Sequence, residues 1–283
     1  MATVEQLADA NMAQIRRLTD FTLAAIREAW WSLGDWHDPG PFTQAILPVL
    51  EGAQLQTAAL TDAYLSALLS EALDAPVPVL GLSAPDVTEL RAGTTMAEAY
   101  ARPFHTVWYQ QSKGMDLAQA LRLGLDRAEH MATMDIQLAR THAASAILRE
   151  SDSVTAFERV LSGSENCDLC SHAARKEYKT SDLMPVHTKC DCTVAPVIEG
   201  RSLVRNINQQ RSTLNPEAER AQDNGETTKR VAVGVEAHGE LGPVLVRKQE
   251  TYPTFTPDTD GWSFDGRGSG KEAGVKTITP EPS

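Results

Sequence analysis

The chain has 283 residues, which is long enough to bury a full hydrophobic core in one or two domains. Hydrophobic residues make up 42% and charged residues 23%, as in an ordinary soluble protein, and no run of about 18 apolar residues predicts a membrane-spanning helix. The net charge of −12 argues against direct binding to nucleic acid, which requires many lysine and arginine contacts with phosphates. The first residues lack the features of a secretory signal peptide, so we expect a protein made in a cytoplasm.

Long amphipathic helices are expected in an N-terminal region, residues 1–75. Between residues 3 and 33, apolar side chains recur at steps of three and four, and we expect Phe21 and Ile26 to widen the buried stripe. A Pro/Gly-rich break at residues 38–41 separates this helix from a second one over 42–73, which Pro48 is expected to kink. The predicted buried face of the second helix consists of Leu55, Ala59, Leu60, Tyr64, Leu68 and Leu69.

A proline-containing linker, residues 76–94, precedes a second helical segment, residues 95–200. Helical patterns cover 96–100 and 104–111, and Asp116 is expected to cap a long helix. A further short helix over 154–161 is expected to lead directly to a cluster of cysteines, with no strand before them.

The composition changes after residue 200. Residues 201–229 are polar and are expected to form a mobile segment. Alternating valines and a glycine-rich turn predict a β-hairpin within 230–256. Gly, Pro, Ser, Thr and charged residues dominate 257–283, which predicts a disordered tail. The expected fold is therefore mainly α (α+β), with a long-helix body, a small zinc-clamped loop region, a C-terminal β-hairpin and a disordered tail.

All four cysteines lie between residues 167 and 192, in the pattern Cys167-x-x-Cys170 followed by His187-x-x-Cys190-x-Cys192. Thiolate and imidazole are the usual ligands of zinc, which binds four of them in a tetrahedron, so five candidates compete for four positions. The x-x spacing of His187 and Cys190 forms a compact chelating loop, and Cys190 is therefore preferred over Cys192. Cys192 remains a close second choice for the fourth ligand.

The predicted zinc site is structural rather than catalytic. Catalytic zinc keeps an open coordination position beside a general acid or base, and neither His-Glu-x-x-His nor the deaminase pattern occurs. The intervening loop, residues 171–186, is polar, so a metal ion would replace the missing hydrophobic core. Phosphate-binding loops, nucleophile elbows and kinase motifs are also missing from the sequence.

The region around the cysteines resembles the MuF-like minor head proteins of tailed bacteriophages, also called head morphogenesis or minor capsid proteins. The His-x-x-Cys-x-Cys motif is the most specific part of a resemblance that spans roughly residues 95–250. The residues that carry it are Cys167, Cys170, Tyr178, 183–187 and 190–194, supported by 100–104, Val107, Trp108 and 238–245.

This resemblance implies a non-enzymatic role in assembly. Such proteins bind the portal protein inside the procapsid, with major capsid or scaffold protein as further candidate partners, and are packaged in few copies. The expected location is the capsid interior of the virion. Two other hypotheses stay open: a capsid-maturation protease or other hydrolase that uses His187 or another histidine, and a zinc-knuckle protein that binds nucleic acid.

Overall fold

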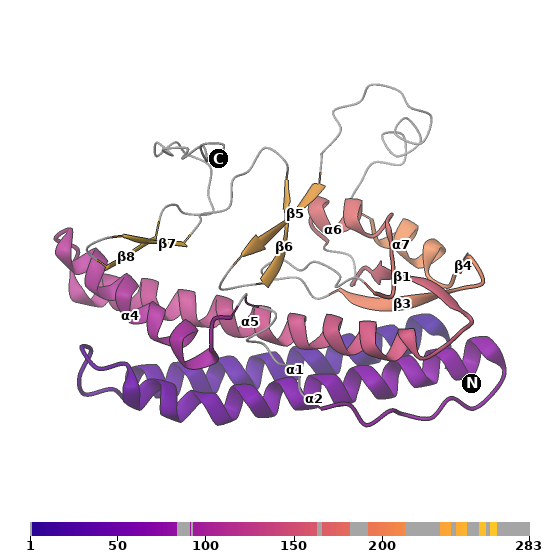
Figure 1. Ribbon diagram of the computed structural model, residues 1–283, viewed down its shortest axis with the longest axis horizontal. Helices are drawn as coiled ribbons and strands as arrows, with labels where there is room; N and C mark the ends of the chain where they lie inside the picture. The colour runs from indigo at the N-terminus through magenta and orange to yellow at the C-terminus, as the bar shows by residue number, and fades with distance from the viewer. Residues whose placement is uncertain are drawn as a thin grey trace, which may run out of the picture.

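A computed structural model describes residues 2–83, 91, 93–162, 166–181 and 192–212, together with four short strands further along the chain. Figure 1 shows long helices beneath a small sheet. The elements in chain order are α1 (Val4–Trp31), α2 (Gly40–Leu73), α4 (Met96–Ser112), α5 (Leu117–Arg149), β1 (Val154–Val160), α6 (Asp168–Ala173), β2 (Glu177–Tyr178), β3 (Thr193–Ile198), β4 (Arg201–Ser202), α7 (Arg205–Arg211), β5 (Val233–His238), β6 (Gly242–Arg247), β7 (Phe255–Asp258) and β8 (Gly261–Phe264).

The long helices begin where side chains can satisfy their first backbone N–H groups. Thr3 caps α1 and Thr95 caps α4, each in a reciprocal capping box with the residue three positions on. Asp116 accepts a hydrogen bond from the backbone N–H of Gln119 at the start of α5, as predicted. Prolines do not end the helices: α2 continues through Pro48, and α4 through Pro103, so that the two predicted patterns at 96–100 and 104–111 form one helix.

Aromatic side chains fill one end of the helical body. The ring of Trp30 in α1 lies 5.2 Å from Phe42 in α2 and 4.9 Å from Phe104 in α4, between ring centroids. Gly124 lets α5 approach this cluster closely, because a Cβ atom there would lie 2.7 Å from the Val107 side chain and 2.8 Å from that of Trp30. This close approach explains a glycine in the interior of a long helix, where it would otherwise be unfavourable.

Some predicted core positions are wrong. Phe21 and Leu55 are exposed, with 68% and 50% of their surface accessible, and Ala59 is exposed as well. Tyr64, Leu68 and Leu69 of the same predicted face are buried. Apolar residues lie around most of the circumference of α2, so their spacing alone did not identify the face that packs against the other helices.

A four-stranded antiparallel sheet with the order β2-β1-β3-β4 lies over the other end of the helical body (Figure 1). Strand β1 contradicts the helix predicted over 154–161. Its pairs with β3 run from Val154 with Ile198 to Val160 with Thr193. Six of its seven residues are buried, Glu158 and Arg159 among them, so the strand lacks the clean alternation of apolar and polar residues that would identify it from the sequence. Its β-branched and aromatic content favours the strand.

Apolar residues of α1, α2, α5, β1 and β3 form one continuous core, so the sheet and the long helices fold together. Two cross-links reinforce this contact. The hydroxyl of Tyr64 in α2 donates to the carbonyl of Val194 at 2.9 Å, and that of Thr193 donates to Asn11 Oδ1 in α1 at 2.9 Å. Burial raises the pKa of Tyr64, which keeps its phenol neutral and able to donate.

The segment after residue 200 is more structured than predicted. Residues 201–202 form β4 and 205–211 form α7, so the mobile segment predicted over 201–229 is wrong for this first part, and 213–229 lie outside the described residues. The predicted hairpin is confirmed as β5 and β6, paired from Val233 with Arg247 to His238 with Gly242. Residues 257–258 and 261–264, predicted as disordered, belong to the small hairpin β7–β8, and 265–283 lie outside the described residues.

The architecture is thus mainly helical with a small antiparallel sheet. No helix in the described ranges is both long and apolar enough to cross a membrane.

Candidate metal centre

The first cysteine pair lies at the start of α6. Cys167 is the N-cap of this short helix, in extended backbone, and its sulfur accepts a hydrogen bond from the backbone N–H of Cys170 at 3.3 Å. Cys167 is exposed, whereas Cys170 is buried. This hydrogen bond orients the Cys167 sulfur over the first turn of α6.

Cys192 lies immediately before β3 and is almost fully buried, with 1% of its surface accessible. The antiparallel register places it opposite the end of β1, because Val160 pairs with the next residue, Thr193. Cys192 belongs to a small apolar cluster with Leu161, Cys170 and Ala174. The structure therefore brings the second cysteine of the first pair and the last cysteine of the second group to the same place.

A buried asparagine on α7 fixes the position of this corner. Asn208 Oδ1 accepts from the backbone N–H of Leu161 at 2.9 Å, and its Nδ2 donates to the carbonyl of Arg159 at 2.8 Å and that of Ala174 at 3.4 Å. One side chain thus joins the end of β1 to the end of α6. No sequence signal indicates this role, because an isolated asparagine in a polar segment resembles a surface residue.

Arg211, at the end of α7, ties the same corner to the long helices. Its guanidinium donates to the carbonyl of Leu161 at 3.0 Å and forms ion pairs with Glu5 at 2.7 Å and Asp9 at 2.9 Å in α1. Asn166, just before Cys167, donates to the carbonyl of Arg211 at 3.0 Å. The segment that leads into the cysteine pair is therefore anchored on both α7 and the helical body.

The hairpin β5–β6 contacts α6 from another direction, as Figure 1 shows. Its buried residues are Val244, Leu245 and Val246. The short helix that carries the first cysteine pair accordingly has neighbours on two sides, the sheet and the hairpin. An ion held at its start would connect parts of the chain that are far apart in sequence.

The complete predicted ligand set is only partly within the described residues. Cys167, Cys170 and Cys192 are described, whereas His187 and Cys190 lie in 182–191, outside them. Among the described residues, no group of three or more His, Cys, Asp or Glu side chains is arranged to hold a metal ion. His172 is partly buried in the last turn of α6. The zinc site, and the preference for Cys190 over Cys192, remain predictions.

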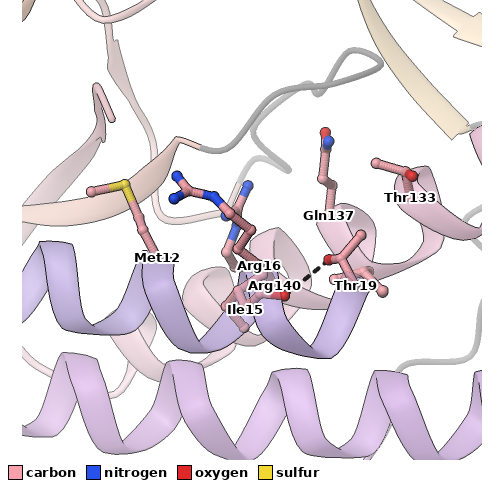
Figure 2. A pocket seen from close by; sticks show the side chains of 8 residues that line it. Met12, Ile15, Arg16, Thr19, Thr133, Gln137 and Arg140 are labelled. Atoms are coloured by element: carbon pink, nitrogen blue, oxygen red, sulfur yellow. Dashed lines mark hydrogen bonds between the residues drawn. The ribbon is translucent and has the colours of Figure 1, made fainter. Parts of the chain in front are cut away.

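A small hollow between α1 and α5 is a second place where a ligand could bind (Figure 2). Thr19 Oγ1 on its wall donates to the carbonyl of Ile15 at 2.9 Å. None of the described residues that line it supplies a carboxylate, imidazole or thiol, so it offers neither metal donors nor an acid–base pair. The lining residues are Met12, Ile15, Arg16, Thr19, Thr133, Ile136, Gln137 and Arg140.

A second polar cluster lies buried near the linker. The Arg91 guanidinium donates to Asp135 on α5, and the hydroxyl of Tyr100 donates to the other carboxylate oxygen at 2.7 Å. Burial, followed by the charge of Asp135, raises the pKa of Tyr100 well above its ordinary value, so the phenol stays neutral. All three side chains are inaccessible to solvent.

Comparison of the chain with protein-family models, with curated proteins and with solved structures gave no significant match. Any function must therefore be argued from the residues themselves.

Proposed function

We propose that this chain is a MuF-like minor head protein of a tailed bacteriophage. It acts as a non-enzymatic assembly factor that binds the portal protein inside the procapsid and is packaged in few copies. It carries a structural zinc ion on four of the five residues Cys167, Cys170, His187, Cys190 and Cys192. The observation that carries the proposal is the meeting of Cys170 and Cys192 at one buried corner, with Cys167 capping the adjacent turn.

The placement of the cysteines supports a structural role for the metal. Cys170 and the neighbouring Cys192 are 3% and 1% exposed, so a zinc ion held beside them would be closed to substrate. A bound zinc ion would cross-link the start of α6 to the segment that enters β3. Without the ion, only an apolar cluster of four small or medium side chains would hold these two segments together. In this role the metal ion would stabilise the fold and would not take part in a reaction.

Zinc binding is tested by elemental analysis of the purified chain, which we expect to contain about one zinc ion per molecule. Cys167→Ser and Cys190→Ser should lose the metal, whereas Cys192→Ser, the matched control for the preferred ligand set, should retain it. The opposite result for Cys190 and Cys192 would exchange their roles and leave the site itself in place. A wild-type chain without stoichiometric zinc would refute the metal site.

The assembly role is tested separately. The chain should co-purify with the portal protein of its own phage when the two are expressed together, and mass spectrometry should find it in purified particles at a few copies each. A chain that never associates with portal and never enters particles would refute the role even if zinc is present. The two experiments thus distinguish a failure of the metal site from a failure of the assembly function.

A further inference from the structure

Helix α1 has a second stripe of regularly spaced residues on the side that faces away from the core. The stripe follows steps of three and four residues, and every member is exposed, including two large aromatic side chains, Phe21 at 68% and Trp31 at 52%. In Figure 1, α1 and α2 form the lower layer of the molecule, and α4, α5 and the sheet all lie above it. We name these residues the outer stripe: Gln14, Arg17, Phe21, Ala24, Glu28 and Trp31.

We propose that two copies of this chain associate by antiparallel pairing of their outer stripes. Alternating steps of three and four are the spacing of a coiled-coil seam, in which side chains of one helix pack between those of another. A twofold axis between Phe21 and Ala24 would make the contact self-complementary, as twofold interfaces require. Phe21 would then lie against the partner subunit's Ala24, so that a large side chain faces a small one. Trp31 would lie against the partner subunit's Gln14, which pairs an indole N–H donor with an amide that can accept it.

The charged members of the outer stripe are complementary in the same register. Arg17 would face Glu28 of the partner subunit, and by symmetry Glu28 would face Arg17 of the partner subunit. Within one helix these two residues are eleven positions apart, about 16 Å along the axis, so they cannot pair with each other. Neither forms an ion pair within the described part of the chain.

The parallel arrangement of the same two helices is much less favourable. It would place Arg17 against Arg17, Glu28 against Glu28 and Phe21 against Phe21. Like charges would then oppose each other in two layers, and two large rings would meet in one layer while Ala24 against Ala24 would leave a gap in the next. The sequence of the outer stripe therefore selects orientation as well as partner.

The outer stripe is also held ready for binding. The inner face of α1 is fixed by buried residues such as Ile15, Ile26 and Trp30, so the helix does not need to fold on association. The ring of Trp31 rests edge-on against Trp36, with 6.2 Å between ring centroids, which limits the rotamer freedom that binding would remove. A contact through one helix of each copy is small, and we expect a reversible dimer rather than a permanent one.

The test is sedimentation velocity of the full chain over concentrations from about 1 to 200 µM, the range in which small interfaces typically associate. We expect a concentration-dependent shift from monomer to dimer. Phe21→Glu should remain monomeric throughout, because it buries a charge where the ring would pack. The matched control is Leu117→Glu at the start of α5, a residue that is 41% exposed and outside the stripe, and it should associate as the wild type does.

Charge reversal tests the antiparallel register. Arg17→Glu alone and Glu28→Arg alone should each weaken self-association by at least about tenfold, since each places like charges in two layers. A mixture of the two variants should form a heterodimer of wild-type strength, because every Glu then faces an Arg. The proposal would be overturned if the wild-type chain stays monomeric at all concentrations or if the mixture fails to associate. It would also be overturned if Phe21→Glu loses portal binding while the wild type shows no self-association.

Discussion

Replacement of Asn208 by leucine tests whether one side chain organises the cysteine corner. Leucine has a similar volume, so the change removes hydrogen bonds without leaving a large cavity. The buried N–H of Leu161 loses its acceptor at 2.9 Å, and the carbonyls of Arg159 and Ala174 lose a donor at 2.8 and 3.4 Å. Each buried polar group left unsatisfied costs about 1–3 kcal/mol, and the long contact to Ala174 contributes least, so we expect a loss of about 2–4 kcal/mol in the free energy of unfolding.

The measurement is urea denaturation followed by circular dichroism, with zinc present in excess. The matched control is Asn206→Leu, the same substitution two residues earlier on the exposed side of α7, which should change the free energy of unfolding by less than about 0.5 kcal/mol. If Asn208→Leu proved as stable as Asn206→Leu, the hydrogen bonds to β1 and α6 would not hold the corner together, and the reasoning would be refuted.

Three further substitutions test the packing of α5 and the ionisation of a buried carboxyl group. Gly124→Ala should destabilise the protein by about 1–3 kcal/mol, although alanine has the better helix propensity, because its Cβ would lie 2.7 Å from a buried side chain. Gly52→Ala is the control: it has open space around it and should stabilise α2 by up to about 1 kcal/mol. Equal changes in the free energy of unfolding would contradict the packing argument. Burial raises the pKa of Glu158, so the folded state loses stability as pH rises from the carboxyl's ordinary value of 4.5 through its folded value. Over that pH interval, the free energy of unfolding of Glu158→Gln should therefore rise relative to that of the wild type, measured by urea denaturation at a series of pH values. If the difference between the two proteins does not change with pH, the ionisation of Glu158 is not coupled to folding.

The long helices were predictable because each is long, and three of the four start at a capping residue. The cap at Asp116 was predicted because a capping side chain acts within one turn, and Thr3 and Thr95, which were not predicted as caps, act over the same short range. Strands β1 and β3 were missed because each is short and buried almost throughout, which removes the alternation that identifies a half-exposed strand. Their composition favours strands only weakly, and their pairing, which joins residues as distant in the chain as Val154 and Ile198, is long-range information.

The candidate metal site shows the same division between local and long-range information. The spacing of Cys167 and Cys170 places both cysteines within one turn, and the structure shows that turn at the N-cap of α6. The burial of Cys192 beside Cys170 could not be read from spacing, because it depends on the register between β1 and β3. Asn208 was beyond prediction for a similar reason, since its partners lie on two other elements.

Phe21 illustrates why periodicity identifies a stripe without saying what covers it. Helix α1 has two apolar stripes, one with Ile15 and Ile26, and one with Phe21 and Trp31. Both satisfy the three-and-four spacing, so the sequence merged them into one wide core face, and only the positions of α2 and α5 separate them. The first stripe packs within the chain. The second has the same spacing, two exposed aromatic rings and oppositely charged residues in symmetric positions, which are the properties of an intermolecular seam rather than of a solvated surface.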